Sequence, residues 1–293
     1  MTLADGIWHQ IFNFENYGEL LTLVRNSLIA GAALGLIGGL AGVFVIMRDL
    51  PFAVHGISEL SFAGASAALL LEMNIVAGSI AGSLIAAGTI GLMGTRARDR
   101  NSVIGIIMPF GLGLGVLFLA LYKGRAANKF GLLTGQIVAV DTPQMSWLLG
   151  TSAVVLIALA VLWRPLTFAS ADPDVAEARG VPVHALSIAF MIVLGLAVAL
   201  SVQIVGALLV LTLVVTPAAA AARVTASPVL LPVLSVVFAV ASIEGGILLA
   251  LGSSIPISPY VTTISFTIYI VCRLAGTHRT RRWGARRTTP QPT

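Results

Sequence analysis

Two residues of types that can bind a metal ion lie four positions apart in an apolar stretch, His55 and Glu59. In an α-helix this spacing places both side chains on one face. An imidazole nitrogen and a carboxylate oxygen are suitable ligands for Zn²⁺, and also for Mn²⁺ or Fe²⁺. Because two ligands cannot complete a four-coordinate site, a symmetric pair of subunits would have to supply the other two. The alternative is a structural pair, in which the two side chains hydrogen-bond each other and hold helices together.

Few other ionisable residues interrupt the apolar stretches, and charge inside a membrane is costly, so each of them is a candidate functional residue. Glu244 and Ser58 are candidates for lining a translocation path with the His–Glu pair. Glu244 could equally be a neutral, hydrogen-bonded acid, and Asp141 lies near the boundary of an apolar stretch. We expect no catalytic residue and no permanently bound cofactor.

The composition places these residues in a membrane protein. Of the 293 residues, 57% are hydrophobic and 10% are charged, whereas soluble domains carry about 25% charged residues. The apolar runs, such as 104–122 and 229–251, reach the length of about 20 residues that spans a bilayer. They do not alternate in polarity as the strands of a membrane barrel do. The sequence therefore predicts an all-α polytopic membrane protein.

Hydropathy predicts about eight or nine transmembrane helices, with a break at Gln203–Gly206 in one long apolar run. The candidate helices lie at 21–47, 52–71, 75–94, 103–122, 146–163, 184–204, 207–223, 229–251 and 258–275. The segment 130–140 is either a re-entrant piece or part of the fifth helix. The expected organisation is an interfacial segment at 1–20, one transmembrane domain at 21–275 and a basic tail at 276–293.

Positive charge indicates the cytoplasmic side of the membrane. The loop that contains Arg96, Arg98 and Arg100 is short and basic, and the segment 273–293 holds six arginines and no acid. Strict alternation of the helices then predicts a cytoplasmic C-terminus and an N-terminus outside. One loop, with Lys123, Arg125 and Lys129, disagrees with this orientation. We interpret the tail as a membrane anchor, so no nucleic-acid partner is expected.

The longest polar stretch between apolar runs contains the signals of a short helix. Asp172 suits the N-cap and Pro173 the first helical position, and Gly180 suits the end of the helix. The charged residues complement the helix dipole, with Asp174 and Glu177 near the start and Arg179 near the end. The sequence thus predicts a helix at 173–179 on the cytoplasmic face. It is either a plain surface helix or one that docks into a groove of another protein.

Four stretches of the chain, in order, resemble one known family. They are GLIGGLAGVFVIMRDLPFAVHGISELSFAGASAALLL at 35–71, RDRNSVIGIIMPFGLGLGVLFLAL at 98–121, ADPDVAEARGVPVHAL at 171–186 and SVQIVGALLVLTLVVTPAAAAARV at 201–224. The stretch at 35–71 is similar to the first two helices of the family, and the stretch at 98–121 to its third loop and fourth helix. The stretch at 171–186 is similar to its cytoplasmic loop, which contains the coupling helix, and the stretch at 201–224 to its most recognisable segment. The family is the membrane permease of metal-ion ABC importers, the zinc, manganese and iron uptake type called ABC-3.

This resemblance implies a type II ABC importer-like permease in a bacterial plasma membrane. It implies a second copy of the chain, a cytoplasmic pair of ABC ATPase subunits and an extracytoplasmic metal-binding protein as partners. It also implies that the helix at 173–179 couples to the ATPase through Asp174, Glu177, Arg179 and Gly180. The transported cargo would be a divalent transition metal, zinc first and manganese or iron next.

The sequence departs from the family pattern in the second helix. The family usually has Asp there and His four residues later, whereas this chain has His55 and then Glu59. Ala63 replaces the family's proline in the same helix, so the kink of this helix is expected to differ.

Two other functions compete with an ABC permease. The sequence has no G-x-x-x-x-G-K-[ST] phosphate loop, so ATP hydrolysis must come from a partner. A proton-coupled secondary metal transporter could use Glu59, Glu244 and His55 as a relay, although the paired repeats common in such proteins are not evident. A membrane scaffold without a substrate is the other alternative, and the intramembrane His–Glu pair argues against it.

Overall fold

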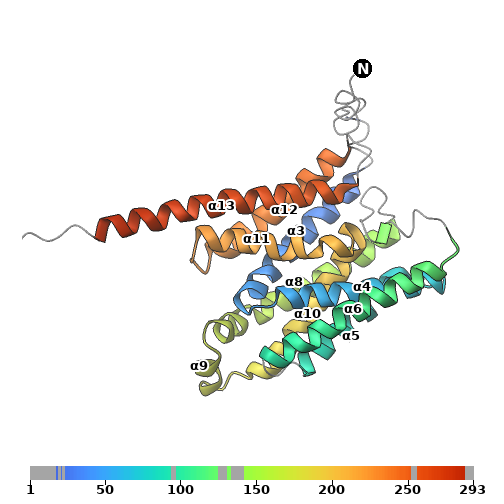
Figure 1. The fold of residues 1–293 in the computed structure, drawn as a ribbon, viewed down its shortest axis with the longest axis horizontal. Helices are drawn as coiled ribbons and strands as arrows, with labels where there is room; N and C mark the ends of the chain where they lie inside the picture. The colour runs from blue at the N-terminus through green and yellow to red at the C-terminus, as the bar shows by residue number, and fades with distance from the viewer. Residues whose placement is uncertain are drawn as a thin grey trace, which may run out of the picture.

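The structure is a computed structural model that describes residues 18, 21, 24–93, 97–124, 131–132, 142–251 and 256–287. The regular elements of these residues are all helices (Figure 1). In chain order they are α3 (Arg25–Met47), α4 (Pro51–Leu70), α5 (Ile75–Met93), α6 (Ala97–Leu121), α8 (Thr142–Ala171), α9 (Pro173–Ala178), α10 (Val183–Val205), the 3₁₀ helix η2 (Ala207–Leu209), α11 (Val210–Val224), α12 (Leu230–Leu251) and α13 (Ile257–Arg287).

Eight of these helices are long and apolar enough to cross a membrane, and α11 is a shorter apolar helix. The eight are α3, α4, α5, α6, α8, α10, α12 and α13. The predicted all-α polytopic membrane fold is therefore confirmed. Asp141 and most of the segments 1–20 and 130–140 lie outside the described residues.

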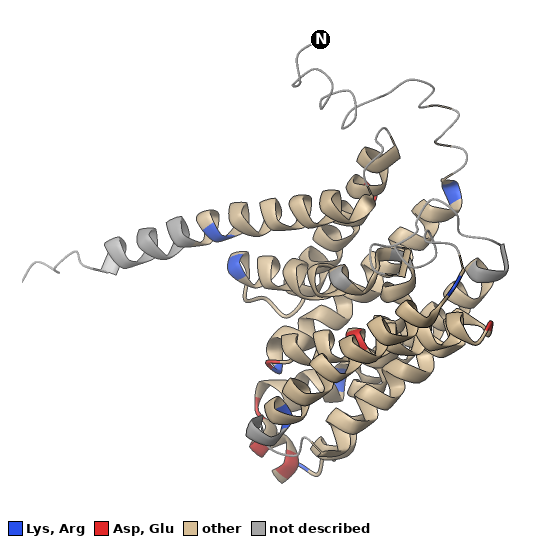
Figure 2. Cartoon of the chain, turned by 45° about the vertical axis from the view of Figure 1, so that its right-hand side comes forward, with Lys and Arg blue, Asp and Glu red and all other residues tan. Residues whose placement is uncertain are grey.

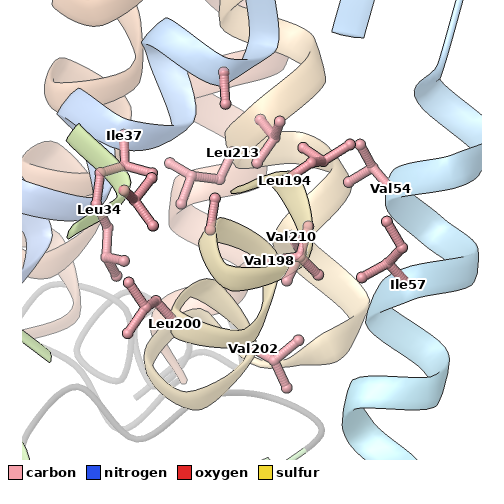
Figure 3. Close-up of a cluster of buried hydrophobic side chains, with 14 of the residues drawn as sticks. Leu34, Ile37, Val54, Ile57, Leu194, Val198, Leu200, Val202, Val210 and Leu213 are labelled. Atoms are coloured by element: carbon pink, nitrogen blue, oxygen red, sulfur yellow. The ribbon is translucent and has the colours of Figure 1, made fainter. Parts of the chain in front are cut away.

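The helices form two groups that share one core. In Figure 1, α3, α11, α12 and α13 lie together on one side of the bundle, and α4, α5, α6, α8 and α10 lie together on the other. Figure 3 shows buried side chains of α3, α4, α10 and α11 meeting between the groups, and several of them have no exposed surface. This buried set includes Leu34, Ile57, Leu194 and Leu213. The shared core fixes α4 at the centre of the molecule.

Glycines on α3 let this helix approach its neighbours closely. A Cβ atom added at Gly39 would lie 2.6 Å from the Cα atom of Val236 on α12. A Cβ atom added at Gly42 would overlap the carbonyl oxygen of Val214 on α11. Small residues at this spacing allow backbone-to-backbone packing of membrane helices. The glycine-rich first span is thus a packing surface.

The long apolar run breaks where the sequence predicted. Helix α10 ends at Val205, and Gly206 has a φ of 86°, a left-handed value that favours glycine. The chain then turns through η2 into α11. The break allows one run of apolar residues to form two antiparallel helices.

Two predicted helix ends are wrong. The helix expected to end at residue 163 continues in α8 to Ala171, with Pro165 inside it. Leu166 and Ala169 are buried there, so packing against the bundle holds the helix together past the proline. The helix expected to end at residue 275 continues in α13 to Arg287, so part of the basic tail is helical.

One end of the bundle gathers most of the loops that carry charge. Arg48 after α3, Arg100 in the first turns of α6 and Glu177 of α9 line one pocket. Figure 2 shows acidic and basic residues gathered at this end, and the long middle parts of the helices almost without charge. Lys123 follows the far end of α6, so the exception to the positive-inside pattern lies at the opposite end.

Candidate functional site

The predicted metal ligands lie on α4, a helix held closely by its neighbours. A Cβ atom added at Gly111 of α6 would lie 2.9 Å from the backbone carbon of Glu59. A Cβ atom added at Gly82 of α5 would overlap the carbonyl oxygen of Leu60. The backbones of α5 and α6 therefore touch the backbone of α4 beside the candidate site. If α4 moves in this region, the adjoining parts of α5 and α6 have to move with it.

His55 and Glu59 lie one helical turn apart, as the spacing predicted. The Nε2 atom of His55 is 3.7 Å from the Oε1 atom of Glu59, which is longer than a hydrogen bond. The Glu59 side chain is 5% exposed, whereas the His55 side chain is 31% exposed. The buried Nδ1 atom of His55 has no hydrogen-bond partner among the described residues. The ligand atoms thus face one another without the hydrogen bond that the structural-pair alternative requires.

Two serines of α4, Ser58 and Ser61, are hydrogen-bonded, whereas the buried hydroxyl of Ser66 has no partner among the described residues. Ser58 is fully buried, and its hydroxyl donates to the carbonyl oxygen of His55 at 2.8 Å. It therefore secures the helical turn of the candidate site. Ser61 donates to the carbonyl oxygen of Ser79 on α5 at 3.0 Å, and Ser79 donates to the carbonyl oxygen of Ala199 on α10 at 3.3 Å. This link between three helices was missed by the sequence analysis, because it requires tertiary contacts.

Glu244 belongs to a different helix interface. It lies on α12, which packs against α3, α11 and α13, whereas α4 packs mainly against α5, α6 and α10. Its Oε1 atom is buried without a hydrogen-bond partner among the described residues. A Cβ atom added at Gly31 of α3 would lie 2.9 Å from that oxygen. The carboxyl group therefore points toward the α3 backbone.

One chain supplies two candidate metal ligands and no more at this place. The described residues contain no group of three or more His, Cys, Asp or Glu side chains that could hold a metal ion. Zn²⁺ in proteins is typically four-coordinate. A site that contains His55 and Glu59 would need further ligands from a second chain, from water or from the cargo's own ligands.

The short helix at the charged end has the caps that the sequence predicted. Asp172 accepts a hydrogen bond from the backbone N–H of Val175 at 3.0 Å. At the other end, Gly180 donates to the carbonyl oxygen of Glu177 and Val181 donates to that of Ala176, which is a Schellman motif. Gly180 has a φ of 84°, so it occupies the left-handed position of this motif.

Helix α9 presents most of its side chains to the outside. Ala176 is fully buried and faces α8 and α10, whereas Asp174, Val175, Glu177 and Arg179 are exposed. The short helix rests on a single alanine, and it exposes the acidic side chains of Asp174 and Glu177 beside the apolar Val175. This arrangement is suited to contact with another protein.

Comparisons with known proteins place this arrangement in a family. The model of the ABC 3 transport family matches residues 21–275. The Manganese transport system membrane protein MntC of Halalkalibacterium halodurans is 25% identical over 247 residues, which are 84% of this chain and 85% of that protein. The Manganese import system permease protein ScaB of Streptococcus parasanguinis is 31% identical over 64% of this chain and 67% of its own length. The High-affinity zinc uptake system membrane protein ZnuB of Haemophilus influenzae is 25% identical over 84% of this chain and 94% of its own length.

Solved structures share the fold. A chain of PsaBC from Streptococcus pneumoniae in complex with Fab superposes with a TM-score of 0.78 at 24% identity, over 87% of this chain and 95% of that chain. An inward-facing putative metal-chelate type ABC transporter gives a TM-score of 0.64 at 20% identity, over 92% of this chain and 89% of that chain. Because the family model matches residues 21–275, most of the chain, this membrane chain belongs to the ABC 3 transport family.

Proposed function

We propose that the chain is the membrane permease subunit of an ATP-driven importer for a divalent transition metal. The observation that carries the proposal is the His55–Glu59 pair on the central helix α4 of an ABC 3 chain. A partly exposed imidazole beside a buried carboxylate offers nitrogen and oxygen ligands on one face. Ionisable side chains within a membrane span are costly unless they have a function.

The ligand types favour zinc first, with manganese and then iron as alternatives. The relatives named above include two manganese transport proteins and one zinc uptake protein. Their names agree with a divalent transition metal as the class of cargo. The choice between zinc and manganese rests on the uptake experiment below.

The incomplete ligand set favours two copies of the permease in the working transporter. Two His nitrogens and two carboxylates would provide four ligands and two negative charges, which offset the charge of a divalent ion. A transient site also has to release its cargo. Because α5 and α6 touch the backbone of α4 at Gly82 and Gly111, we infer that parts of these helices move together when the ligands separate.

The energy for import would come from two cytoplasmic ATPase subunits, and the metal from an extracytoplasmic binding protein. We infer that α9 docks on the ATPase, and that its N-cap and C-cap keep the helix rigid when the ATPase subunits push against it. Its exposed residues Asp174, Glu177 and Arg179 would form the contact. In this orientation α9 and the C-terminal tail would face the cytoplasm, in a bacterial plasma membrane.

Uptake of radioactive zinc and manganese by cells that lack the native permease tests this function. Cells complemented with the wild-type chain should accumulate one of these metals, and cells with His55→Ala or Glu59→Gln should not. Glu72→Gln is the matched control, because Glu72 is an exposed acid beyond the other end of α4. Co-purification of each variant with the ATPase shows whether the complex still assembles. Wild-type uptake by an assembled His55→Ala transporter would refute the assignment of the ligands.

A further inference from the structure

A pocket of about 230 Å³ lies at the end of the bundle that carries α9. Its polar lining comes from elements far apart in the chain, namely Arg48, Arg100, Glu177, His184 and Ser187. Apolar residues at the ends of α4, α5 and α10 complete the walls. The space is several times the volume of about 30 Å³ that one water molecule occupies in the liquid.

The two arginines of the pocket have unused hydrogen-bond donors. Arg48 donates from Nη2 to the Ser187 hydroxyl, and its guanidinium lies 5.8 Å from the ring centroid of Phe190. Its other amino nitrogen, Nη1, is buried without a partner, as is the Nε atom of Arg100. No carboxylate of the described residues forms an ion pair with either arginine. The hydrogen bond to Ser187 thus holds the Arg48 guanidinium at the pocket, and no acid of the described residues neutralises either arginine.

The electrostatics of the pocket favour an anion. A buried hydrogen-bond donor without a partner destabilises the protein, and a charged donor does so more strongly. Burial, and then the nearby charge of Arg100, lowers the pKa of the Arg48 guanidinium. Glu177 is the one carboxylate among the lining residues, and it is exposed. Two guanidinium groups against one carboxylate leave the lining positive even when His184 is neutral.

The pocket lies at the level where the membrane spans end. Arg48 follows the last residue of the first span, and Arg100 is the first residue of the fourth. Val183 begins the span of α10, and Ile90 and Gly91 lie in the last turn of α5. Lipid headgroups are found at this depth, and phosphate dissolved in the aqueous phase reaches it as well.

We propose that this pocket binds a phosphate group, either the phosphodiester of an anionic phospholipid or free inorganic phosphate. Guanidinium groups match phosphate oxygens with paired donors, and a tetrahedral phosphate has enough oxygens to accept from two arginines at once. The bound group would satisfy the free nitrogens of Arg48 and Arg100. It would also link the starts of α4, α6 and α10 beside α9, at the surface assigned above to the ATPase.

Two binding measurements on the purified full-length permease test this proposal and separate the two sources of phosphate. Native mass spectrometry measures the retention of phosphatidylglycerol, and calorimetric titration with inorganic phosphate measures binding from solution. Removal of one guanidinium group that donates hydrogen bonds to the phosphate is expected to lower the affinity for phosphate about tenfold or more. We expect Arg100→Gln to lower the affinity for one of the two probes by that factor. Arg48→Lys, which keeps the charge and loses the paired donors, should lower it as well.

The control is Arg164→Gln, because Arg164 is an exposed arginine of α8 that does not line the pocket. Selective loss of phosphatidylglycerol identifies the lipid as the source, and selective loss of inorganic phosphate identifies the solution. The proposal is wrong if the wild-type chain binds neither probe, or if Arg164→Gln loses as much affinity as Arg100→Gln. It is also wrong if Arg100→Gln only weakens co-purification with the ATPase, because the pocket would then receive a protein side chain.

Discussion

Gly180 provides a direct test of the role of α9, because a substitution there changes the backbone and little else. Its φ is 84°, and a Cβ atom added at this position meets no heavy atom within 4 Å. The cost of a side chain therefore comes from the left-handed conformation, without a steric clash. That cost is about 1–2 kcal/mol for an ordinary residue and up to about 3 kcal/mol for a strained one. Asn tolerates this conformation better than other residues with a side chain.

These values predict a graded series of variants. A six-residue helix has no stability of its own and depends on its caps and its packing. If Gly180→Val destabilises the left-handed turn after α9 by about 2–3 kcal/mol, the ratio of chains with this turn to chains with another backbone conformation there falls by roughly 30- to 150-fold. Gly180→Asn should behave almost as the wild type, Gly180→Ala should be intermediate, and Gly180→Val should lose most of the coupling to ATP hydrolysis.

The assay is ATP hydrolysis by the permease and ATPase complex in nanodiscs, measured with and without metal-loaded binding protein. The ratio of the two rates reports coupling, and the amount of permease in the membrane reports insertion. Gly88→Val is the matched control, since a Cβ atom at Gly88 of α5 also meets open space but the φ there is not left-handed. A wild-type ratio for Gly180→Val, or equal losses for Asn and Val, would refute the reasoning.

Three further predictions concern the bundle. Gly39→Ala should lower the thermal unfolding temperature of the purified permease, because the new Cβ atom would lie 2.6 Å from the Val236 Cα atom and overpacking costs about 1–3 kcal/mol. Gly105→Ala is the control, because a Cβ atom at Gly105 meets open space and should leave the unfolding temperature unchanged. Equal decreases for the two variants would contradict the packing argument. Glu244→Gln should leave metal uptake close to the wild-type rate if the acid is neutral in the bundle, whereas a loss of uptake by an assembled complex would place Glu244 on the cargo's path. Truncation after Gly276 should leave uptake largely intact because the arginines of the tail act as an anchoring group, and complete loss with normal insertion would show a further role.

Features set by local interactions could be predicted from the sequence. The caps of α9 depend on residues within a few positions of one another, so Asp172, Pro173 and Gly180 indicated its start and end. The shared face of His55 and Glu59 follows from helix geometry alone. The break after Val205 was visible because glycine and a polar residue interrupt a run too long for one span.

Features set by contacts between distant segments could not be predicted. Pro165 looks like a helix end in the sequence, but burial of Leu166 and Ala169 keeps α8 helical beyond it. Glu244 was grouped with His55 and Glu59 because all three are ionisable residues in apolar stretches, whereas in the structure its carboxyl group lies at the α3–α12 interface. The proximity of Arg48 and Arg100 depends on how the end of α3 and the start of α6 lie beside each other, for which the periodicity of the sequence gives no signal.

The contacts of Arg48 connect the two parts of the proposed mechanism. Ser187, which accepts from Arg48, lies in the second turn of α10, the helix that follows α9 in the chain. Arg48 in turn lies three residues before Pro51, the first residue of α4, and His55 lies in the second turn of that helix. A force on α9 that shifts the start of α10 would therefore reach the start of α4 through one side-chain contact. Because α5 and α6 touch the α4 backbone beside Glu59, the same shift would have to move these helices with the ligands. Coupling by this route requires a two-state rearrangement of the packed unit, since a closely packed core does not deform continuously.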